Sequence, residues 1–230
     1  MPAPRPGRDD GHAAGRRGGR GKPRNAVQAE IADRGGRAAR PHRHRGRSSE
    51  RLMDKGAILG ALRIGEGWRV LDAGCGNGYM SKEFSKRVGS TGIVYAFDTD
   101  ERSIAALRAE TSGTNIVAMA GDITGDTGLP AGVFDLIYLS AVLHGFPPER
   151  FSGFQAEVGR LLAPGGRLAV VEIVKRETPF GPPMGIRVSP EELKAAIRMT
   201  AGATVDVGDY FYLQLFENRP NRPHDADGNG

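Results

Sequence analysis

The stretch Val70-Leu71-Asp72-Ala73-Gly74-Cys75-Gly76-Asn77-Gly78-Tyr79 decides the fold of this chain. It begins as a short apolar run between glycines, which predicts a buried β-strand over residues 68–71. The three glycines that follow at alternate positions permit positive φ angles and a close approach of a ligand to the backbone. Residues 79–88 then carry apolar side chains at four-residue spacing, which predicts a helix. A strand, a glycine-rich loop and a helix in this order indicate a ligand site at the carboxyl end of a parallel strand.

The spacing of the glycines narrows the class of ligand. Gly74, Gly76 and Gly78 are spaced G-x-G-x-G, whereas the dinucleotide fingerprint is G-x-G-x-x-G. The acid Asp72 lies two residues before the first glycine. This pattern resembles motif I of the class I S-adenosylmethionine (SAM) methyltransferases. The resemblance implies that the loop surrounds the methionine end of SAM and that Asp72 helps to hold its polar atoms.

A second predicted strand, residues 92–98, ends in Asp98. An acid at this point can accept two hydrogen bonds from a ribose diol. The resemblance implies this role for Asp98 and places Thr99 beside it in the cofactor site. The alternative for Asp98 is the N-cap of the helix that follows, although Thr99 or Asp100 can also serve as that cap.

A third predicted strand, residues 115–120, is followed by Asp122 and Ile123. The resemblance implies that Asp122 meets the amino group of adenine and that Ile123 packs on the adenine ring. The alternative is an ordinary turn, which a Gly-Asp pair also favours.

A fourth predicted strand begins at Phe134 and leads to Ser140 and His144. The resemblance implies that Ser140 borders SAM and the reaction centre. His144 is a candidate general base, and the alternative is a residue that packs or shapes the substrate pocket. Glu172 ends a fifth strand, residues 167–172, where it either faces the cleft or anchors a loop.

The last part of the chain predicts a helix and a hairpin. Ser189-Pro190-Glu191-Glu192 is a helix start with a capping box, and we expect the helix to run to about Ala201. Residues 204–207 and 210–216 then predict two antiparallel strands. The fold class is therefore α/β, with a doubly wound, mostly parallel, seven-stranded sheet of the Rossmann-like methyltransferase type and an antiparallel C-terminal hairpin strand.

Charge divides the 230 residues into a tail and a body. Residues 1–47 contain 13 Lys or Arg and 4 Asp or Glu, whereas the rest of the chain carries 19 basic and 23 acidic side chains. We expect a disordered Arg/Gly-rich tail over 1–47, a methyltransferase domain over 48–217 and a disordered C-terminal tail over 218–230. The basic tail suits nonspecific contact with nucleic acid through phosphate charge. The alternative is a leader with no selected role.

Composition also bounds the location and the chemistry. The sequence has no apolar run near 18 residues, so we expect no membrane span and a cytoplasmic location. The single cysteine excludes an internal disulfide, and its place in the glycine loop favours a small packing residue over a nucleophile. We expect no metal, because no His/Cys cluster has ligand spacing.

A sequence pattern that is missing after the fourth strand restricts the class of methyl acceptor. Ser140-Ala141-Val142-Leu143 stands where relatives that methylate exocyclic amino groups carry Asn/Asp-Pro-Pro-aromatic. The chain therefore resembles the small-molecule, ubiquinone/menaquinone C-methyltransferase-like group, with residues 172–193 as either a substrate flap or a connecting loop. Two alternatives remain open. One is an RNA-associated methyltransferase or binding protein that uses the basic tail, and the other, disfavoured by the third glycine, is a nicotinamide-dependent oxidoreductase.

Overall fold

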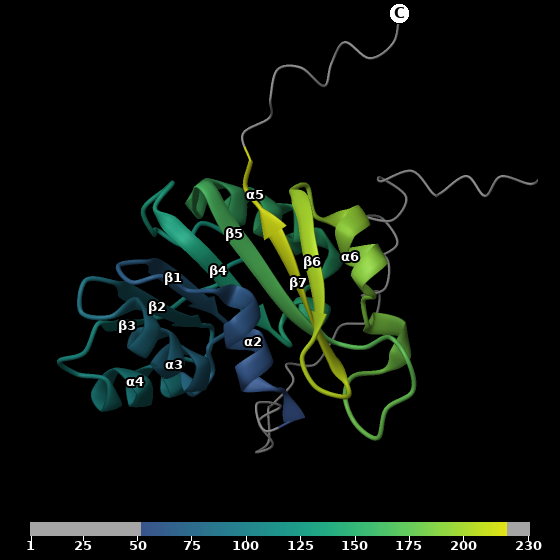
Figure 1. Cartoon of the computed structure of the whole chain (residues 1–230), viewed down its shortest axis with the longest axis horizontal. Helices are drawn as coiled ribbons and strands as arrows, with labels where there is room; N and C mark the ends of the chain where they lie inside the picture. The colour runs from purple at the N-terminus through teal and green to yellow at the C-terminus, as the bar shows by residue number, and fades with distance from the viewer. Residues whose placement is uncertain (1–51, 220–230) are drawn as a thin grey trace, which may run out of the picture.

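One seven-stranded sheet organises residues 52–219, which are the residues that the computed structural model describes (Figure 1). Its strands are β1 (Arg69–Ala73), β2 (Ile93–Asp98), β3 (Ile116–Ala120), β4 (Phe134–Ser140), β5 (Leu162–Ile173), β6 (Thr200–Asp206) and β7 (Phe211–Glu217). The order across the sheet is 3-2-1-4-5-7-6. β7 runs antiparallel to β5 and β6, and the other pairings are parallel. The predicted fold class is confirmed, and β3 and β6 form the two edges of the sheet.

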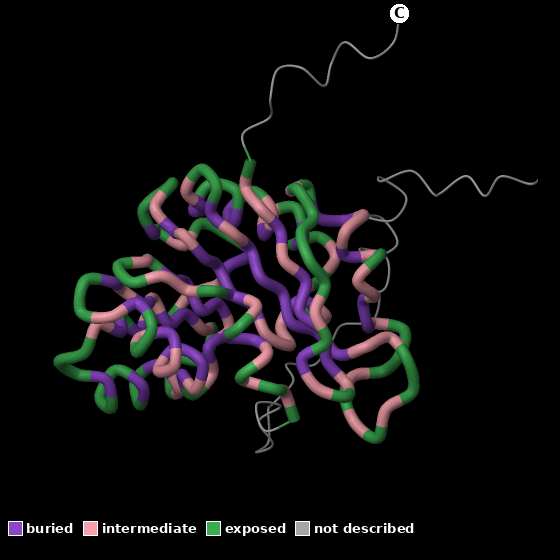
Figure 2. The backbone as a smooth tube through the Cα atoms, in the orientation of Figure 1, coloured by how far each residue is buried: buried purple, intermediate pink, exposed green. Residues whose placement is uncertain are grey.

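Helices cover both faces of this sheet, so the molecule has three layers. They are α2 (Lys55–Leu62), α3 (Tyr79–Val88), α4 (Glu101–Glu110), α5 (Phe151–Leu161) and α6 (Pro190–Ala196), with short 3-10 turns η2 (Leu143–Gly145), η3 (Pro148–Arg150) and η4 (Met184–Ile186). Side chains of α2, α3 and α4 share one buried cluster with one face of the sheet, and those of α5 and α6 share a second cluster with the other. Figure 2 shows the buried residues concentrated along the central strands. In the described part of the chain, no helix is both long and apolar enough to cross a membrane.

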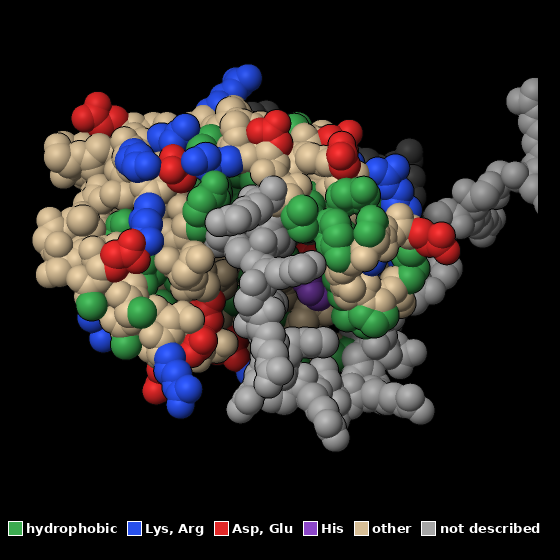
Figure 3. Space-filling model, turned by 90° about the horizontal axis from the view of Figure 1, so that it is seen from below, with side chains coloured by type: hydrophobic (Ala, Val, Ile, Leu, Met, Phe, Trp, Pro, Cys, Tyr) green, Lys and Arg blue, Asp and Glu red, His purple; other side chains and the backbone are tan. Residues whose placement is uncertain are grey.

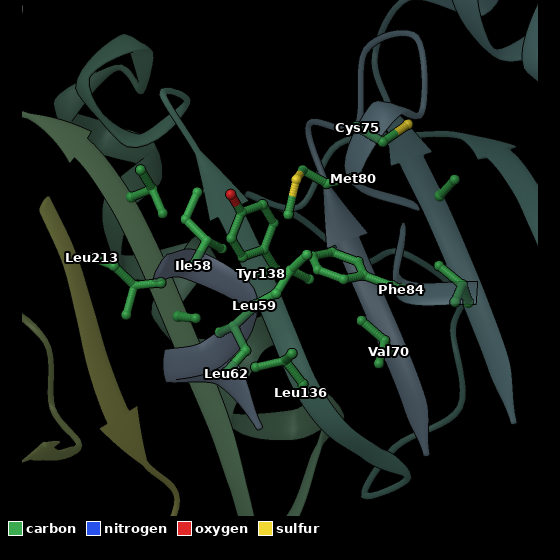
Figure 4. Close-up of a cluster of buried hydrophobic side chains, with 14 of the residues drawn as sticks. Ile58, Leu59, Leu62, Val70, Cys75, Met80, Phe84, Leu136, Tyr138 and Leu213 are labelled. Atoms are coloured by element: carbon green, nitrogen blue, oxygen red, sulfur yellow. The ribbon is translucent and has the colours of Figure 1, made fainter. Parts of the chain in front are cut away.

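The cluster under α2 and α3 fixes the glycine loop against the sheet (Figure 4). Phe84 on α3 meets Tyr138 on β4 edge to face, with 5.1 Å between the ring centroids. Such a buried aromatic pair contributes about 0.5–1.5 kcal/mol beyond the area it buries. Because α3 begins directly after the loop, this contact holds the loop beside the carboxyl end of β4.

The C-terminal helix is shorter than the sequence predicts. α6 begins as expected, with the Ser189 side chain and Glu192 forming a capping box, but it ends at Ala196 and not near Ala201. Thr200 and Ala201 pair with β7 and start β6 instead. The prediction was wrong because strand pairing with a neighbour far along the chain overrode the local helical preference.

The predicted domain limits, 48–217, differ slightly from the described residues, 52–219. The predicted tail 1–47 lies outside the described residues, as do residues 220–230 of the C-terminal tail. Asn218 is described, and it exchanges backbone hydrogen bonds with the first part of β5: its N–H donates to the Gly166 carbonyl and its carbonyl accepts from the Gly165 N–H, both at 2.8 Å. The sheet-side pairing therefore extends one residue past Glu217.

Candidate functional site

The glycine loop joins β1 to α3 in a conformation that needs glycine at three positions. Gly74, Gly76 and Gly78 have φ angles of +80°, +53° and +74°. A Cβ at Gly74 would lie 2.3 Å from the Val142 side chain, and one at Gly78 would lie 2.4 Å from Leu107. A Cβ at Gly76 would meet nothing within 4 Å. Gly74 and Gly78 therefore allow close packing of the loop, whereas the central glycine borders open space.

Asp98 lies at the carboxyl end of β2, directly against this loop. One carboxylate oxygen accepts the Gly76 N–H at 2.9 Å, and the other accepts the Asp100 N–H at 2.9 Å. Asp100, not Asp98, caps α4, because its side chain accepts the Arg102 N–H. The capping alternative for Asp98 is thus not realised, and its half-buried carboxylate keeps lone pairs for further donors. Thr99 is exposed at the same strand end.

Asp72 lies beneath the loop and not on its open side. The residue is 3% exposed, and its carboxylate accepts the Ser81 hydroxyl at 2.5 Å. It thereby ties β1 to the first turn of α3. Burial raises the pKa of the neighbouring Cys75 thiol, and the charges of Asp72 and Asp98 raise it further. A buried thiol held neutral is a poor nucleophile, which favours the packing role predicted for Cys75.

Asp122, in the turn after β3, uses both carboxylate oxygens in contacts with other residues of the protein. One carboxylate oxygen accepts from the backbone N–H of Thr124 at 2.8 Å and from its hydroxyl at 2.6 Å. The other pairs with the Arg150 guanidinium of η3, a partner that no sequence pattern indicated. Ile123 is 5% exposed and packs in the cluster under α5. The turn role is therefore realised for Asp122, and an adenine contact stays a prediction for both residues.

The carboxyl end of β4 is covered by the segment before α2. The Ser140 hydroxyl lies 3.5 Å from the Met53 sulfur, and the Asp54 N–H donates to the Val207 carbonyl at 2.8 Å. Ala141 follows with a φ of +54°, one of two positive values among non-glycine residues in the described region. Backbone strain of this kind is concentrated at functional sites in proteins, because the surrounding structure must hold it.

The structure brings together two residues that the sequence treated separately. The His144 ring nitrogen Nδ1 lies 2.7 Å from a Glu172 carboxylate oxygen, and the His144 backbone N–H donates to the other oxygen at 3.3 Å. The Glu172 side chain is 1% exposed and that of His144 is 17% exposed. Burial lowers the pKa of His144, but the charge and hydrogen bond of Glu172 outweigh burial and the repulsion from Arg187, so the pKa is raised.

Arg187 fixes the segment between β5 and α6. The residue is only 5% exposed, and its guanidinium donates hydrogen bonds to four backbone carbonyls of the same segment. The acceptors are Val174, Arg176, Phe180 and Pro182. The segment predicted as a flap or a connecting loop is therefore cross-linked internally by one buried side chain. Among residues 52–219, no three His, Cys, Asp or Glu side chains gather closely enough to hold a metal ion.

Comparison with known proteins identifies the family. Residues 70–166 match the family model described as a methyltransferase domain. The crystal structure of a SAM-dependent methyltransferase from Aquifex aeolicus superposes with a TM-score of 0.66 at 25% identity, over 83% of this chain and 97% of that one. This chain carries a methyltransferase domain, and its fold is that of SAM-dependent methyltransferases.

Two curated methyltransferases share part of the sequence. A probable cobalt-precorrin-6B C(15)-methyltransferase (decarboxylating) of Saccharolobus solfataricus is 33% identical over 124 residues, which are 52% of this chain and 59% of the relative. A ubiquinone/menaquinone biosynthesis C-methyltransferase of Hydrogenovibrio crunogenus is 34% identical over 134 residues, 56% of this chain and 51% of the relative. The methyltransferase thus spans between half and three fifths of the length of these relatives.

The co-substrate of the family fits the donor set at this edge of the methyltransferase. The open side of Gly76 leaves room where a side chain would otherwise project. The Asp98 carboxylate beside it has acceptor capacity for hydroxyl donors such as those of a ribose. An uncharged loop with one carboxylate at its rim suits a ligand with a diol and a cationic centre better than a pyrophosphate.

Three contacts at the site could not be found from the sequence. The partners in each are far apart along the chain: 28 residues for His144 with Glu172, also 28 for Asp122 with Arg150, and 87 for Ser140 with Met53. Only the end-of-strand position of Glu172 gave a signal, because parallel strands deliver their carboxyl ends to one edge.

Proposed function

We propose that this methyltransferase transfers the methyl group of SAM to a small-molecule acceptor. The observation that carries the proposal is the hydrogen bond from the Gly76 N–H to Asp98, since it holds a carboxylate beside the one glycine of this loop that borders open space. Asp98, with Thr99 beside it, would bind the ribose, and the loop of Gly74, Gly76 and Gly78 would surround the methionine end. Asp72 would act indirectly by holding α3 in place.

Methyl transfer from SAM needs no covalent bond between the protein and the methyl group. When bound, SAM supplies an activated methyl group on a sulfonium sulfur. The protein must hold the acceptor atom in line with the sulfur–carbon bond and exclude water, and most of the rate then comes from proximity and orientation. Ser140 and the covering Met53 lie at the edge where the acceptor would be placed, next to the carboxyl end of β4.

A small acceptor is supported by the relatives and by the segment after β4. One relative is a probable methyltransferase of a cobalt-precorrin, and the other is a C-methyltransferase of ubiquinone or menaquinone biosynthesis. Ser140-Ala141-Val142-Leu143 lacks the Asn/Asp-Pro-Pro-aromatic pattern of enzymes that methylate exocyclic amino groups. The basic tail that would favour an RNA acceptor lies outside the described residues, so only experiment separates the two acceptors.

Two measurements test the proposal. Isothermal titration of the full chain with SAM should give saturable binding, and the absence of saturation at millimolar SAM would contradict it. A cell extract incubated with the enzyme and methyl-labelled SAM should then carry label in the small-molecule fraction. Label recovered in the RNA fraction alone would instead support the RNA-associated alternative.

A further inference from the structure

We propose that His144 is the general base of the methyl transfer and that Glu172 is its positioning residue, so the acceptor is a weakly acidic hydroxyl of the phenol or enol class. This inference rests on the proposed methyl transfer and adds to it the chemistry of the acceptor. The tautomer and pKa of His144 in the resting protein can be tested without any acceptor.

His144 and Glu172 are held in one orientation by two contacts. Both oxygens of one buried carboxylate face a single histidine: Oε2 lies 2.7 Å from Nδ1, and Oε1 accepts the backbone N–H at 3.3 Å. Ring and backbone are therefore oriented together. A carboxylate is an acceptor, so it selects the neutral tautomer with the proton on Nδ1 and leaves the lone pair on Nε2. Within residues 52–219, Nε2 has no hydrogen-bond partner of its own.

The pair lies at the carboxyl ends of two neighbouring strands, with His144 just after β4 and Glu172 near the end of β5. The left-handed backbone at Ala141 turns the chain as it leaves β4, and its N–H is held by the Val171 carbonyl at 2.9 Å. Val142 then fills the space above Gly74. His144 follows two residues later, so it is tied to the glycine loop through one packed side chain. In Figure 3 the purple side chain is the one histidine of the described region, and hydrophobic side chains, in green, lie on the same face.

Charged groups on two neighbouring segments act on the His144 imidazole. Glu172 on β5 favours the imidazolium, whereas burial and Arg187 from the following segment oppose it. Tyr212 on β7 also lies near Glu172, but its hydroxyl donates to the Val188 carbonyl at 2.7 Å, and burial with the charge of Glu172 raises its pKa. Tyr212 therefore stays neutral, and the balance gives His144 a raised pKa. A more basic imidazole is a better match for a hydroxyl that ionises above neutral pH.

The step balances without a further reactant. Nε2 of His144 takes the hydroxyl proton of the acceptor and becomes part of an imidazolium beside the Glu172 carboxylate. The electron pair of the O–H bond becomes available on the acceptor oxygen, which forms a bond to the methyl carbon. The carbon–sulfur bond breaks with its pair left on sulfur, giving the neutral thioether and a methyl ether. The proton leaves His144 to solvent after product release.

The competing interpretation is that the pair only anchors the turn after β4. It predicts the same hydrogen bonds, so a test needs readouts that an anchor would not change. These are the tautomer and pKa of His144, the pH dependence of the rate, and the kind of bond that is made.

The first experiment is nuclear magnetic resonance of the full chain labelled with ¹⁵N in histidine, in the presence of SAM. His144→Gln assigns the resonance among the five histidines of the sequence. We expect the Nδ1–H tautomer and a pKa above the ordinary value of about 6.5, and Glu172→Gln should lower that pKa and mix the tautomers. Glu157→Gln, which removes a buried carboxylate paired with Arg160 on α5, is the matched control and should leave His144 unchanged. An Nε2–H tautomer in the wild type would overturn the proposal.

The second experiment measures label transfer from methyl-labelled SAM to the small-molecule fraction of a cell extract. At pH 7, His144→Gln should be slower by about 100-fold or more, the usual contribution of a general base, with SAM affinity kept and the loss reduced at higher pH. Glu172→Gln should shift the acid limb of the pH profile downward. A loss below about 3-fold, a pH-independent loss, or a labelled product other than a methyl ether would overturn the proposal. If the wild type transfers no label at all, the proposed function fails while the resonance result still stands.

Discussion

The two halves of the sheet edge are built in different ways. Around β1 and β2, the site consists of a glycine loop and one acid, and the key hydrogen bond from Gly76 to Asp98 spans 22 residues. Around β4 and β5, the site consists of His144 with Glu172, joined over 28 residues, and Ser140 with the covering Met53, joined over 87 residues. The first half, here called the SAM half, follows from backbone requirements of nearby residues. The second half, here called the acceptor half, depends on which strands become neighbours. This difference predicts which substitutions should change the stability of the fold and which should change ligand binding or the reaction.

The largest effect is expected where the two halves touch, at Gly74. In Gly74→Ala, the new Cβ would lie 2.3 Å from Val142 while the backbone keeps a φ of +80°. Left-handed strain and overpacking together should reduce the free energy of unfolding by about 2–5 kcal/mol. Urea denaturation measures this loss.

Gly76→Ala is the matched control, because its Cβ meets nothing within 4 Å. It should lose about 1–2 kcal/mol from positive φ alone and act mainly on SAM affinity. Adding Val142→Ala to Gly74→Ala should restore part of the lost stability. Equal losses for Gly74→Ala and Gly76→Ala would show that the two halves are not coupled at this contact.

The next largest effect is expected on SAM affinity, which should depend on the first half of the site much more than on the second. Asp98→Ala should weaken SAM binding by about 10- to 100-fold, since it removes charge-assisted hydrogen bonds and leaves the Gly76 N–H without its acceptor. Glu172→Ala should change the SAM dissociation constant far less. Titration calorimetry on both variants measures the contrast, and comparable losses would remove the division into a SAM half and an acceptor half.

A third effect tests the acceptor half through stability and pH. The pKa of His144 is raised in the folded state, so the pair stabilises the protein fully below the unfolded pKa of about 6.5 and loses this contribution as pH rises through the raised value. Glu172→Gln should therefore reduce stability by about 1–2 kcal/mol more at pH 5.5 than at pH 9. Denaturation at the two pH values measures it, and a pH-independent difference would argue against an ion pair.

The smallest effect is expected at the rim of the SAM half. Arg150 pairs with Asp122, but both side chains are more than one third exposed. Exposed ion pairs contribute about 0–1 kcal/mol, so Arg150→Ala should leave stability nearly unchanged. SAM affinity should change by no more than a few-fold, or rise if the freed Asp122 contacts adenine. A large loss of SAM affinity would show that Arg150 itself belongs to the site.

The sequence predicts the SAM half better than the acceptor half for a physical reason. Alternating glycines have few explanations other than positive φ and close approach, and the observed angles at Gly74, Gly76 and Gly78 meet that requirement. By contrast, a lone histidine and an acid at a strand end each have several roles. Their pairing becomes visible only when β4 and β5 lie side by side, as Ser140 does with Val171.

The C-terminal region shows the same limit in secondary structure. The capping box at Ser189 predicts the start of α6 correctly, because a cap is satisfied within four residues. The end of α6 could not be predicted, because Thr200 and Ala201 are held by hydrogen-bonded pairing with Glu217 and Phe216 of β7.

The sequence by itself determined the α/β class, the glycine loop, the caps and the family, since each depends on backbone preferences over a few residues. The tertiary structure alone decided that α6 stops early, that Asp72 is buried under α3, that Arg187 fixes the segment after β5, and that Glu172 holds His144. These outcomes arise from contacts between residues distant in sequence, whose energies no local pattern encodes. The glycine loop after β1 thus defines where SAM is expected to bind. The fold around β4 and β5 defines the groups that would act on the methyl acceptor.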